Sequence, residues 1–398
     1  MFYRTCSKFL MACFFTAAFA MAGNAADVIK IGSVAPKSGA LAGGATVTQW
    51  PNVELWSKQV NAAGGINVGG KKMMVEVIEY DDKTNPAEHI KAAQRLATQD
   101  KVDFIVAPYG TGFNLAAAPI YAKYGYPQLA VSAITDKGPE LTERYDNFFL
   151  LLGDTTSFTN SVVDVLTDMR SAGKIGSRVA MVNVADAFGI ELAEAARPAL
   201  EAANFEIVYD KSYPLGTPDL SPIMKGAKDS NPDAFIAWSY PPDTFALTEQ
   251  AIIQQLDVKM FYTAVATCFP AYKGAFGEKI NGVFGAGGVN PDTPGIAEYM
   301  KAHKEITGKD ADYWASANTY VALQILHQAI EGSGTLDKAT VTNFIKSNTF
   351  DTIMGPINFE NQISKRFWTV GQWQNGKFYG VKSSNMDGEA SIIDKPSW

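Results

Sequence analysis

Short apolar and β-branched runs alternate along the chain with longer segments in which apolar residues recur at helical spacing. The run at 102–108 (VDFIVAP) is apolar after Asp103, which is typical of a strand buried on both faces of a parallel sheet. Alternating strands and helices predict an α/β fold with two Rossmann-like sets of parallel strands, each of domain size. Further strands are predicted at 28–35, 73–80, 127–132, 179–185, 233–238 and about 258–264, and helices at 87–99, 113–124, 187–203, 219–230 and 242–256.

Three segments interrupt this alternation and are interpreted as crossings between two lobes. The segment 146–154 (DNFFLLLGD) lacks helical spacing, and 281–290 (NGVFGAGGVN) is apolar and rich in glycine. A third crossing is expected near 352–359, after helices at 295–307 and 312–331. Each lobe is then discontinuous, with 27–148 and 286–353 in the N-terminal lobe and 149–285 and 354–398 in the C-terminal lobe.

The N-terminal residues have the three-part layout of a secretory signal peptide. Arg4 and Lys8 precede an apolar stretch at 9–20, and small residues follow at 20–26 (AMAGNAA). The apolar stretch is too short for a transmembrane helix. We therefore expect residues 1–26 to be removed on export to the periplasm, although cleavage after Ala22, Ala25 or Ala26 fits equally well.

Composition excludes several classes of partner. The chain has 34 Lys and Arg against 41 Asp and Glu, a net charge of −7, and no long charged run. Nucleic-acid binding needs clustered basic residues, so it is not expected. No later stretch is long and apolar enough to predict a transmembrane helix. Without residues 1–26 only Cys268 remains, so no intrachain disulfide is expected and Cys268 is interpreted as a packing residue.

The sequence lacks the patterns expected of a metal site, a hydrolase or a dinucleotide-binding enzyme. His89, His303 and His327 lie far apart, and there is no G-x-S-x-G motif. Gly110-Thr111-Gly112 begins like a dinucleotide loop, but Leu115 stands where the third glycine belongs. The adjacent Asp81 and Asp82 are interpreted as part of a loop that caps the next helix, with Asn85 as the N-cap and Pro86 at the first helical position. We therefore expect no metal, no cofactor and no catalytic activity.

Candidate binding residues gather where ligands bind in open α/β sheets, beyond the carboxyl ends of the strands. The loops of the first lobe carry hydroxyl groups and open backbone at a helix start, which can hold a carboxylate. The loops of the second lobe carry aromatic rings. Together they suit a molecule with an anionic end and a flat or apolar end. The candidates are Ser38, Tyr109, Gly110, Thr111, Gly112, Ser132, Ala133 and Thr135 in the first lobe, and Phe188, Trp238, Tyr240 and Val265 in the second.

The ordered motifs of the chain resemble those of a known family. They include IKIGSVAPKSGALAGGA, the long stretch from VNAAGGINVGG to VDFIVAP, DAFGIELAEAARPALE at 186–201 and NTYVALQILHQAI at 318–330. In this order they are similar to the type I periplasmic substrate-binding proteins of branched-chain amino-acid-type ABC transporters. The resemblance implies a Venus-flytrap fold with three hinge crossings, ligand capture by closure of the lobes, and delivery to a membrane ABC permease. A monomer is the default expectation.

The resemblance also implies roles for individual residues. The carboxylate-holding loop falls on Thr111 and Gly112, and the next ligand loop on Ser132, Ala133 and Thr135. Second-lobe aromatic contacts fall on Phe188 and on Trp238 or Tyr240. A late aromatic contact from the first lobe falls on Tyr313 or Trp314, and we take Trp314 as the candidate.

Two departures from the family pattern bear on the ligand. Members that bind α-amino acids hold the ammonium with an acid in the loop at 263–267, which reads Thr-Ala-Val-Ala-Thr here. A buried ammonium without an anionic partner is costly. Gly44 also replaces a typical aromatic residue, which we expect to enlarge the cleft. We therefore expect an aromatic or keto carboxylic acid, unless Asp154, Asp186 or Asp243 supplies the anion for an amino acid or amide.

Two other functions remain open from the sequence. A sensory receptor could use the same ligand-binding fold and would differ by its membrane partner. A secreted hydrolase would have to turn over its bound ligand, and the absence of a nucleophile and base counts against it.

Overall fold

The computed structural model describes residue 1 and residues 28–398. Apart from Met1, the predicted signal peptide at 1–26 lies outside the described residues.

The first sheet has the strand order β2-β3-β1-β4, formed by Ile66–Val68, Lys71–Asp81, Val28–Ala35 and Phe104–Val106. β1 runs parallel to β3 and β4, whereas β2 and β3 form an antiparallel hairpin. β5 (Gln128–Ala130) pairs in parallel with β6 (Phe148–Leu150). The segment interpreted as a plain connection at 146–154 therefore begins with a short buried strand, because its three apolar residues pair with β5.

The second sheet is larger, with the order β15-β14-β11-β10-β9-β7-β8. Its five parallel strands include the predicted β7, β9 and β10, whereas β11 lies in the segment interpreted as a crossing at 281–290. An antiparallel hairpin of β14 and β15 extends one edge. This mixed edge did not follow from the alternation of strands and helices. The strands are β7 (Arg178–Val184), β8 (Glu206–Tyr213), β9 (Ala234–Trp238), β10 (Met260–Thr263), β11 (Phe284–Ala286), β14 (Phe367–Gln374) and β15 (Lys377–Ser384).

Helices cover both sheets. α1 begins at Ala42, shortly after β1. The helices are α1 (Ala42–Thr48), α2 (Trp50–Ala62), α3 (Pro86–Arg95), α4 (Thr111–Tyr124), α5 (Gly138–Arg144), α6 (Thr155–Ser171), α7 (Ala187–Ala202), α8 (Ser221–Asp229), α9 (Pro241–Gln254), α10 (Pro270–Phe276), α11 (Pro294–Thr307), α12 (Ala315–Ser333) and α13 (Lys338–Ser347). A π-helical turn (Leu96–Asp100) extends α3, and a 3₁₀ turn (Gly277–Ile280) follows α10.

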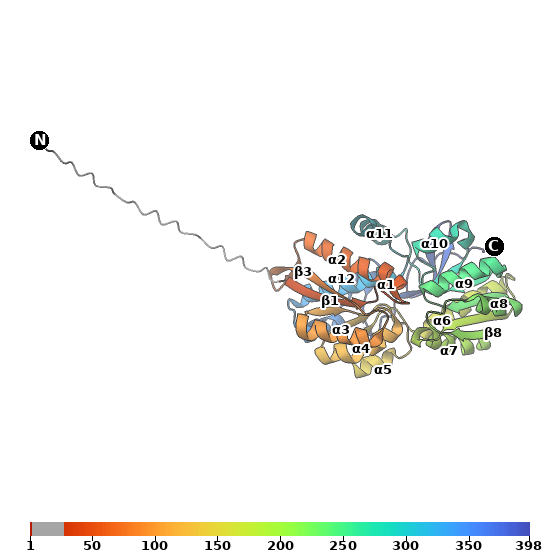
Figure 1. The fold of residues 1–398 in the computed structure, drawn as a ribbon, viewed down its shortest axis with the longest axis horizontal. Coiled ribbons are helices and arrows are strands. Elements are labelled where there is room, and N and C mark those ends of the chain that lie inside the picture. Colours follow the sequence, from red (N-terminus) through yellow and green to blue (C-terminus); the bar gives the residue numbers. More distant parts are fainter. Residues whose placement is uncertain (2–27) are drawn as a thin grey trace.

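The elements form two groups that lie side by side (Figure 1). α1 to α5 lie on one side with β1 and β3, and α6 to α9 lie on the other with β8. The late helices α11 and α12 pack against α2, and the hairpin of β12 (Phe350–Thr352) and β13 (Gly355–Ile357) packs near α12. β14 and β15 then complete the second sheet. Each group is thus assembled from separate stretches of the chain.

Asp81, at the end of β3, and Asp82 organise the loop that follows. Asp81 accepts hydrogen bonds from the backbone of Lys37 and from the Ser38 hydroxyl. Asp82 is buried and lies 3.1 Å from Nδ1 of the buried His89. Asn85 caps α3 by accepting from two backbone N–H groups, with Pro86 at the first helical position. Cys268 is fully buried, in agreement with a packing role.

Candidate functional site

A cavity lies between the two groups of elements, at the carboxyl ends of β4, β5, β7, β9 and β10. It comprises about 360 Å³ of space not filled by atoms, part of it open to solvent. This is the position at which open α/β sheets bind ligands. The lining consists of Tyr109, Gly110, Ser132, Ile134, Leu152, Phe188, Tyr240, Val265, Trp314 and Ala315.

Four aromatic rings line the cavity. The rings of Phe188 and Tyr240 lie 4.9 Å apart at an angle of 31° on the side of the second sheet. Tyr109 and Trp314 face them from the first group, and all four side chains are buried. The lining contains no acidic, basic or histidine side chain. Such a cavity favours a flat, mainly apolar molecule.

The prediction that Gly44 enlarges the cleft is wrong. A Cβ atom at Gly44 would lie 2.0 Å from the hydroxyl oxygen of Tyr109, so the tyrosine ring already occupies the space that a side chain would take. The aromatic group has not been lost from this region. It is supplied by the loop after β4 instead of by α1.

The start of α4 supplies the open backbone in the site. Gly110 has φ +96°, which residues with a side chain rarely adopt, and no side chain caps the helix. Ser132 holds this turn, because its hydroxyl accepts from the Gly110 N–H at 3.0 Å and donates to the Pro108 carbonyl at 2.7 Å. The first N–H groups of α4 therefore keep no side-chain acceptor and can receive an anion.

Three candidates from the sequence lie away from the lining because they bond to other parts of the protein. Ser38 is exposed, and its hydroxyl donates to Asp81 at 2.7 Å. The Thr135 hydroxyl donates to Glu191 at 2.6 Å. Trp238 is a core residue whose indole N–H points to the sulfur of Met181 at 3.3 Å.

Three further candidates lie behind the lining. The buried Thr111 hydroxyl accepts from the N–H of Ile134 at 3.2 Å, which joins the loop after β5 to α4. Ala133 is fully buried in that loop. Gly112 faces Ala187 of α7, because a Cβ on it would lie 3.8 Å from that methyl group.

The structure adds three residues that the sequence did not single out, Ile134, Leu152 and Ala315. Their small or aliphatic side chains carry no signal that separates a cavity wall from ordinary core. The two candidates for the late aromatic residue lie in different places. Trp314 lines the cavity, whereas the ring of Tyr313 lies 5.7 Å from that of Trp373.

A buried carboxylate fixes the backbone that carries Trp314. Oδ1 of Asp312 accepts from the N–H groups of Trp314 and Ala315, each at 2.7 Å, and Oδ2 accepts from the N–H of Ser316 at 2.9 Å. Burial raises the pKa of Asp312. These bonds satisfy the first N–H groups of α12, so Asp312 is a positioning residue for the cavity wall.

The carboxylates considered as partners for an ammonium group do not line the cavity. Asp154 caps α6 through the N–H of Ser157 at 2.6 Å. Asp186 caps α7 through the N–H of Gly189 at 3.0 Å, and burial raises its pKa. Asp243 accepts from the N–H of Tyr240 at 3.4 Å, and burial raises its pKa to about 6. All three serve helix starts.

The raised pKa of Asp243 predicts a pH-dependent contribution to stability. The folded state holds this proton more tightly than the unfolded chain, whose pKa is near 3.8. The contribution is therefore full below that value and is lost as the pH rises through about 6. We expect the difference in unfolding free energy between the wild type and Asp243→Asn to change by roughly 2–3 kcal/mol between pH 4 and 7. Urea denaturation at several pH values measures it.

Asp219 offers a control of opposite sign. Hydrogen bonds from Ser221 lower the pKa of this exposed carboxylate, so its contribution is lost as the pH falls. The prediction is contradicted if the difference in unfolding free energy between the wild type and Asp243→Asn does not change with pH. It is also contradicted if this difference changes with pH in the same direction as the difference for Asp219→Asn.

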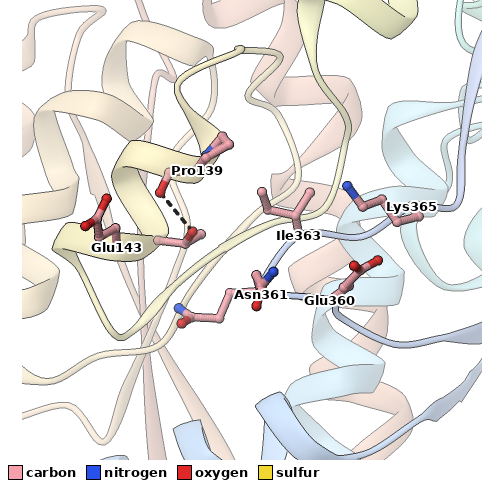
Figure 2. A pocket seen from close by; sticks show the side chains of 8 residues that line it. Pro139, Glu143, Glu360, Asn361, Ile363 and Lys365 are labelled. Atoms are coloured by element: carbon pink, nitrogen blue, oxygen red, sulfur yellow. Dashed lines mark hydrogen bonds between the residues drawn. The ribbon is translucent and has the colours of Figure 1, made fainter.

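A second hollow, between α5 and the turn at 360–363, has a different character (Figure 2). Glu143, Glu360 and Lys365 line it, and none of the candidate residues from the sequence does. The Thr142 hydroxyl in its wall donates to the carbonyl of Pro139. It lacks aromatic walls, so we do not assign it as the ligand site.

Within residues 28–398, no group of three or more His, Cys, Asp or Glu side chains is placed to hold a metal ion. Among these described residues no helix is long and apolar enough to cross a membrane.

Comparison with known proteins supplies the family. The family model described as periplasmic binding protein matches residues 28–377. A Leu/Ile/Val-binding protein homolog 7 of Brucella suis is 25% identical over 399 residues, covering 94% of this chain and 96% of its own.

Two solved structures share the fold. The branched-chain amino acid transporter substrate-binding protein LivJ of Streptococcus pneumoniae, in complex with isoleucine, has a TM-score of 0.78 at 21% identity, covering 92% of this chain and all of its own. A solute-binding protein of an R. palustris ABC transporter, in complex with 4-hydroxybenzoate, has a TM-score of 0.75 at 22% identity, covering 94% and 99%. With the matching family model, the two-sheet α/β fold and the cavity at the strand ends, the chain belongs to the periplasmic binding protein family, whose members bind solutes and are not enzymes.

Proposed function

We propose that this protein is the extracytoplasmic solute-binding protein of an ABC importer and captures a small aromatic carboxylic acid between its lobes. The observation that carries the ligand class is the cavity lining, with four aromatic rings and no charged side chain. A carboxylate can be held by the start of α4, but an α-ammonium has no anionic partner in the wall. The aromatic rings suit a benzoate-like or aryl keto acid.

The second candidate ligand is an aliphatic amino acid, because some similar proteins are described as binding one. Among similar folds one protein holds isoleucine and another holds 4-hydroxybenzoate. The curated relative from Brucella is named for leucine, isoleucine and valine. The same scaffold therefore accommodates both classes, and the wall of the cavity decides between them.

Mass spectrometry of small molecules released on denaturation, followed by calorimetric titration, tests the ligand class. Titrants are 4-hydroxybenzoate, phenylpyruvate, isoleucine and leucine. We expect an aromatic acid to bind at least about tenfold more tightly than either amino acid. The reason is that the desolvation of an ammonium group buried without an anionic partner is more unfavourable than packing against the rings is favourable. Tighter binding of isoleucine would overturn the aromatic-acid class and leave the solute-binding role intact.

Trp314 and Tyr313 form a matched pair of variants for the site itself. We expect Trp314→Ala to weaken binding of the aromatic acid by about 100-fold, because it removes a buried ring from the wall. Tyr313→Ala removes the adjacent ring outside the cavity and should change affinity by less than about threefold. Equal effects of the two variants in calorimetry would place the ligand elsewhere.

We further propose that ligand binding stabilises a closed arrangement of the lobes. Glu191 of α7 accepts from the Thr135 hydroxyl at 2.6 Å and pairs with Lys137 at 3.0 Å, and so joins α7 to the loop after β5. The N–H of Thr156 in α6 donates to Asp136 in the same loop at 3.0 Å. These bonds exist only while the two groups of elements are in contact.

Glu191→Ala is therefore expected to weaken ligand binding by about fivefold without altering the cavity wall, because a charge-assisted bond across the cleft is lost. Small-angle scattering of the ligand-free variant should show a larger radius of gyration than the wild type. Glu194→Ala, at an exposed position on the same helix, should leave both properties unchanged. Unchanged affinity in Glu191→Ala would show that these bonds do not control closure.

We also propose where the protein is located, what receives its ligand and how its lobes are divided. Export by the signal peptide at 1–26 places it in the periplasm as a monomer, where a membrane permease receives the closed form. The lobes comprise 27–148 with 286–353, and 149–285 with 354–398. Fusion of residues 1–40 to a reporter that is active only outside the cytoplasm tests the export step.

A further inference from the structure

A separate hollow lies where the segment after β11 passes the β12–β13 hairpin and the start of β14. It holds about 620 Å³ of space not filled by atoms, part of it open to solvent. Its apolar wall includes Val289, Ile296, Met354 and Trp368, and its polar wall includes Thr293 and Arg366. We call these six residues the junction pocket. The pocket shares no lining residue with the aromatic cavity.

Arg366 is the cation of the junction pocket, and its bonding within the protein is incomplete. The Nε atom is buried and has no hydrogen-bond partner. One Nη atom lies 3.8 Å from a carboxylate oxygen of Asp387, whose side chain is fully exposed to solvent. A buried N–H without an acceptor is destabilising, and an exposed ion pair at this separation contributes little to stability. The guanidinium can therefore donate hydrogen bonds to an anion that binds closer than Asp387 does.

Thr293 and the start of α11 favour the same kind of ligand, whereas the Asp387 carboxylate, which also lines the pocket, competes for Arg366. Thr293 is the N-cap residue of α11, yet its side chain makes no capping hydrogen bond. Pro294 occupies the first helical position and has no N–H, and Ile296 in the first turn of this 14-residue helix lines the pocket. The start of a helix carries partial positive charge, which adds to the charge of Arg366.

We propose that the junction pocket binds a small organic carboxylate with a short apolar group, at a site distinct from the aromatic cavity. The carboxylate bonds to the Arg366 guanidinium and the Thr293 hydroxyl. Its apolar part lies against Trp368 and Met354. A guanidinium matches a carboxylate in planar geometry, and the apolar wall separates such ligands from inorganic anions.

Butyrate is the probe, and the side-chain Nε–H resonance of Arg366 is the readout, in protein labelled with ¹⁵N at arginine. This resonance is identified by its loss in Arg366→Gln. We expect it to shift and saturate with butyrate at constant ionic strength, and to stay in place with butylammonium. Because the readout belongs to Arg366 itself, butyrate that enters the aromatic cavity is not mistaken for binding here.

Variants of opposite expected effect sharpen the test. Arg366→Gln should weaken butyrate binding at this site, followed by the side-chain resonance of Trp368, by at least about tenfold. Asp387→Asn should tighten butyrate binding by about three- to tenfold, because it removes the carboxylate that competes for Arg366. Asp387 is exposed, so we expect this variant to fold. If Arg366→Gln does not fold, Arg366→Lys keeps the charge and should bind more weakly than the wild type.

Arg95→Gln is the matched control. Arg95 is likewise paired loosely with a carboxylate, that of Asp100 at 3.9 Å, but it lies on α3 outside the pocket. Its replacement should leave butyrate binding unchanged. The proposal is overturned if the Arg366 resonance does not respond to butyrate, or if Arg366→Gln and Arg95→Gln bind butyrate equally.

Discussion

Replacing Gly44 with alanine is expected to destabilise the protein by about 2 kcal/mol and to weaken ligand binding by about tenfold. The new methyl group would lie 2.0 Å from the hydroxyl oxygen of Tyr109 and 2.3 Å from the ring carbon that bears it. Tyr109 is buried and lines the aromatic cavity, so its ring cannot move without changing the wall. Urea denaturation and calorimetric titration of the cavity ligand measure the two effects.

The neighbouring Gly43 provides a matched control in the same helix. A methyl group there would lie 3.8 Å from Pro241, an ordinary contact. Gly43→Ala should therefore be neutral or stabilising by about 0.5 kcal/mol. Adding Tyr109→Ala to Gly44→Ala should recover part of the lost stability, because the clash disappears with the ring. Equal stability of the two glycine variants would contradict the assignment of Tyr109 to this space.

Asp312→Ala is expected to lower the free energy of unfolding by about 3 kcal/mol and to abolish measurable ligand binding. The substitution leaves the N–H groups of Trp314, Ala315 and Ser316 without acceptors at the start of α12. Trp314 would then lose its position over the cavity, where a Cβ on Gly287 would lie 2.0 Å from the indole ring. Denaturant unfolding and tryptophan fluorescence of the ligand complex report the two effects.

Asp310→Ala serves as the control for Asp312→Ala. Asp310 is two residues earlier, exposed, and paired with Lys304 at 2.8 Å. Its loss should cost less than about 1 kcal/mol and leave binding intact. If Asp312→Ala bound the ligand as tightly as Asp310→Ala, the positioning role of Asp312 would be wrong.

Much of the fold follows from local pattern. The apolar residues of β4 match its burial, and the cap formed by Asn85 and Pro86 is a property of a few neighbouring residues. The loops that carry the candidate binding residues could also be predicted, because they follow strands that the local pattern indicates. A parallel strand leads its loop to one edge of the sheet, so Tyr109, Ser132, Phe188 and Tyr240 converge once the strands are assigned.

Other features depend on partners distant in the chain, and no local pattern encodes them. Whether Gly44 leaves a space depends on the ring of Tyr109, 65 positions away, and whether Thr135 is free depends on Glu191 of α7. The β14–β15 hairpin joins the second sheet only because the chain returns there after α13.

The sequence by itself predicted the alternation of strands and helices and the chemistry of the strand-end loops. Both arise from contacts between near neighbours and from the common direction of parallel strands. The shape of the cavity, the choice of Trp314 over Tyr313 and the support from Asp312 arose from packing between separate segments. Packing is determined by which atoms fill the same space, and that becomes defined only when the two sheets are brought together.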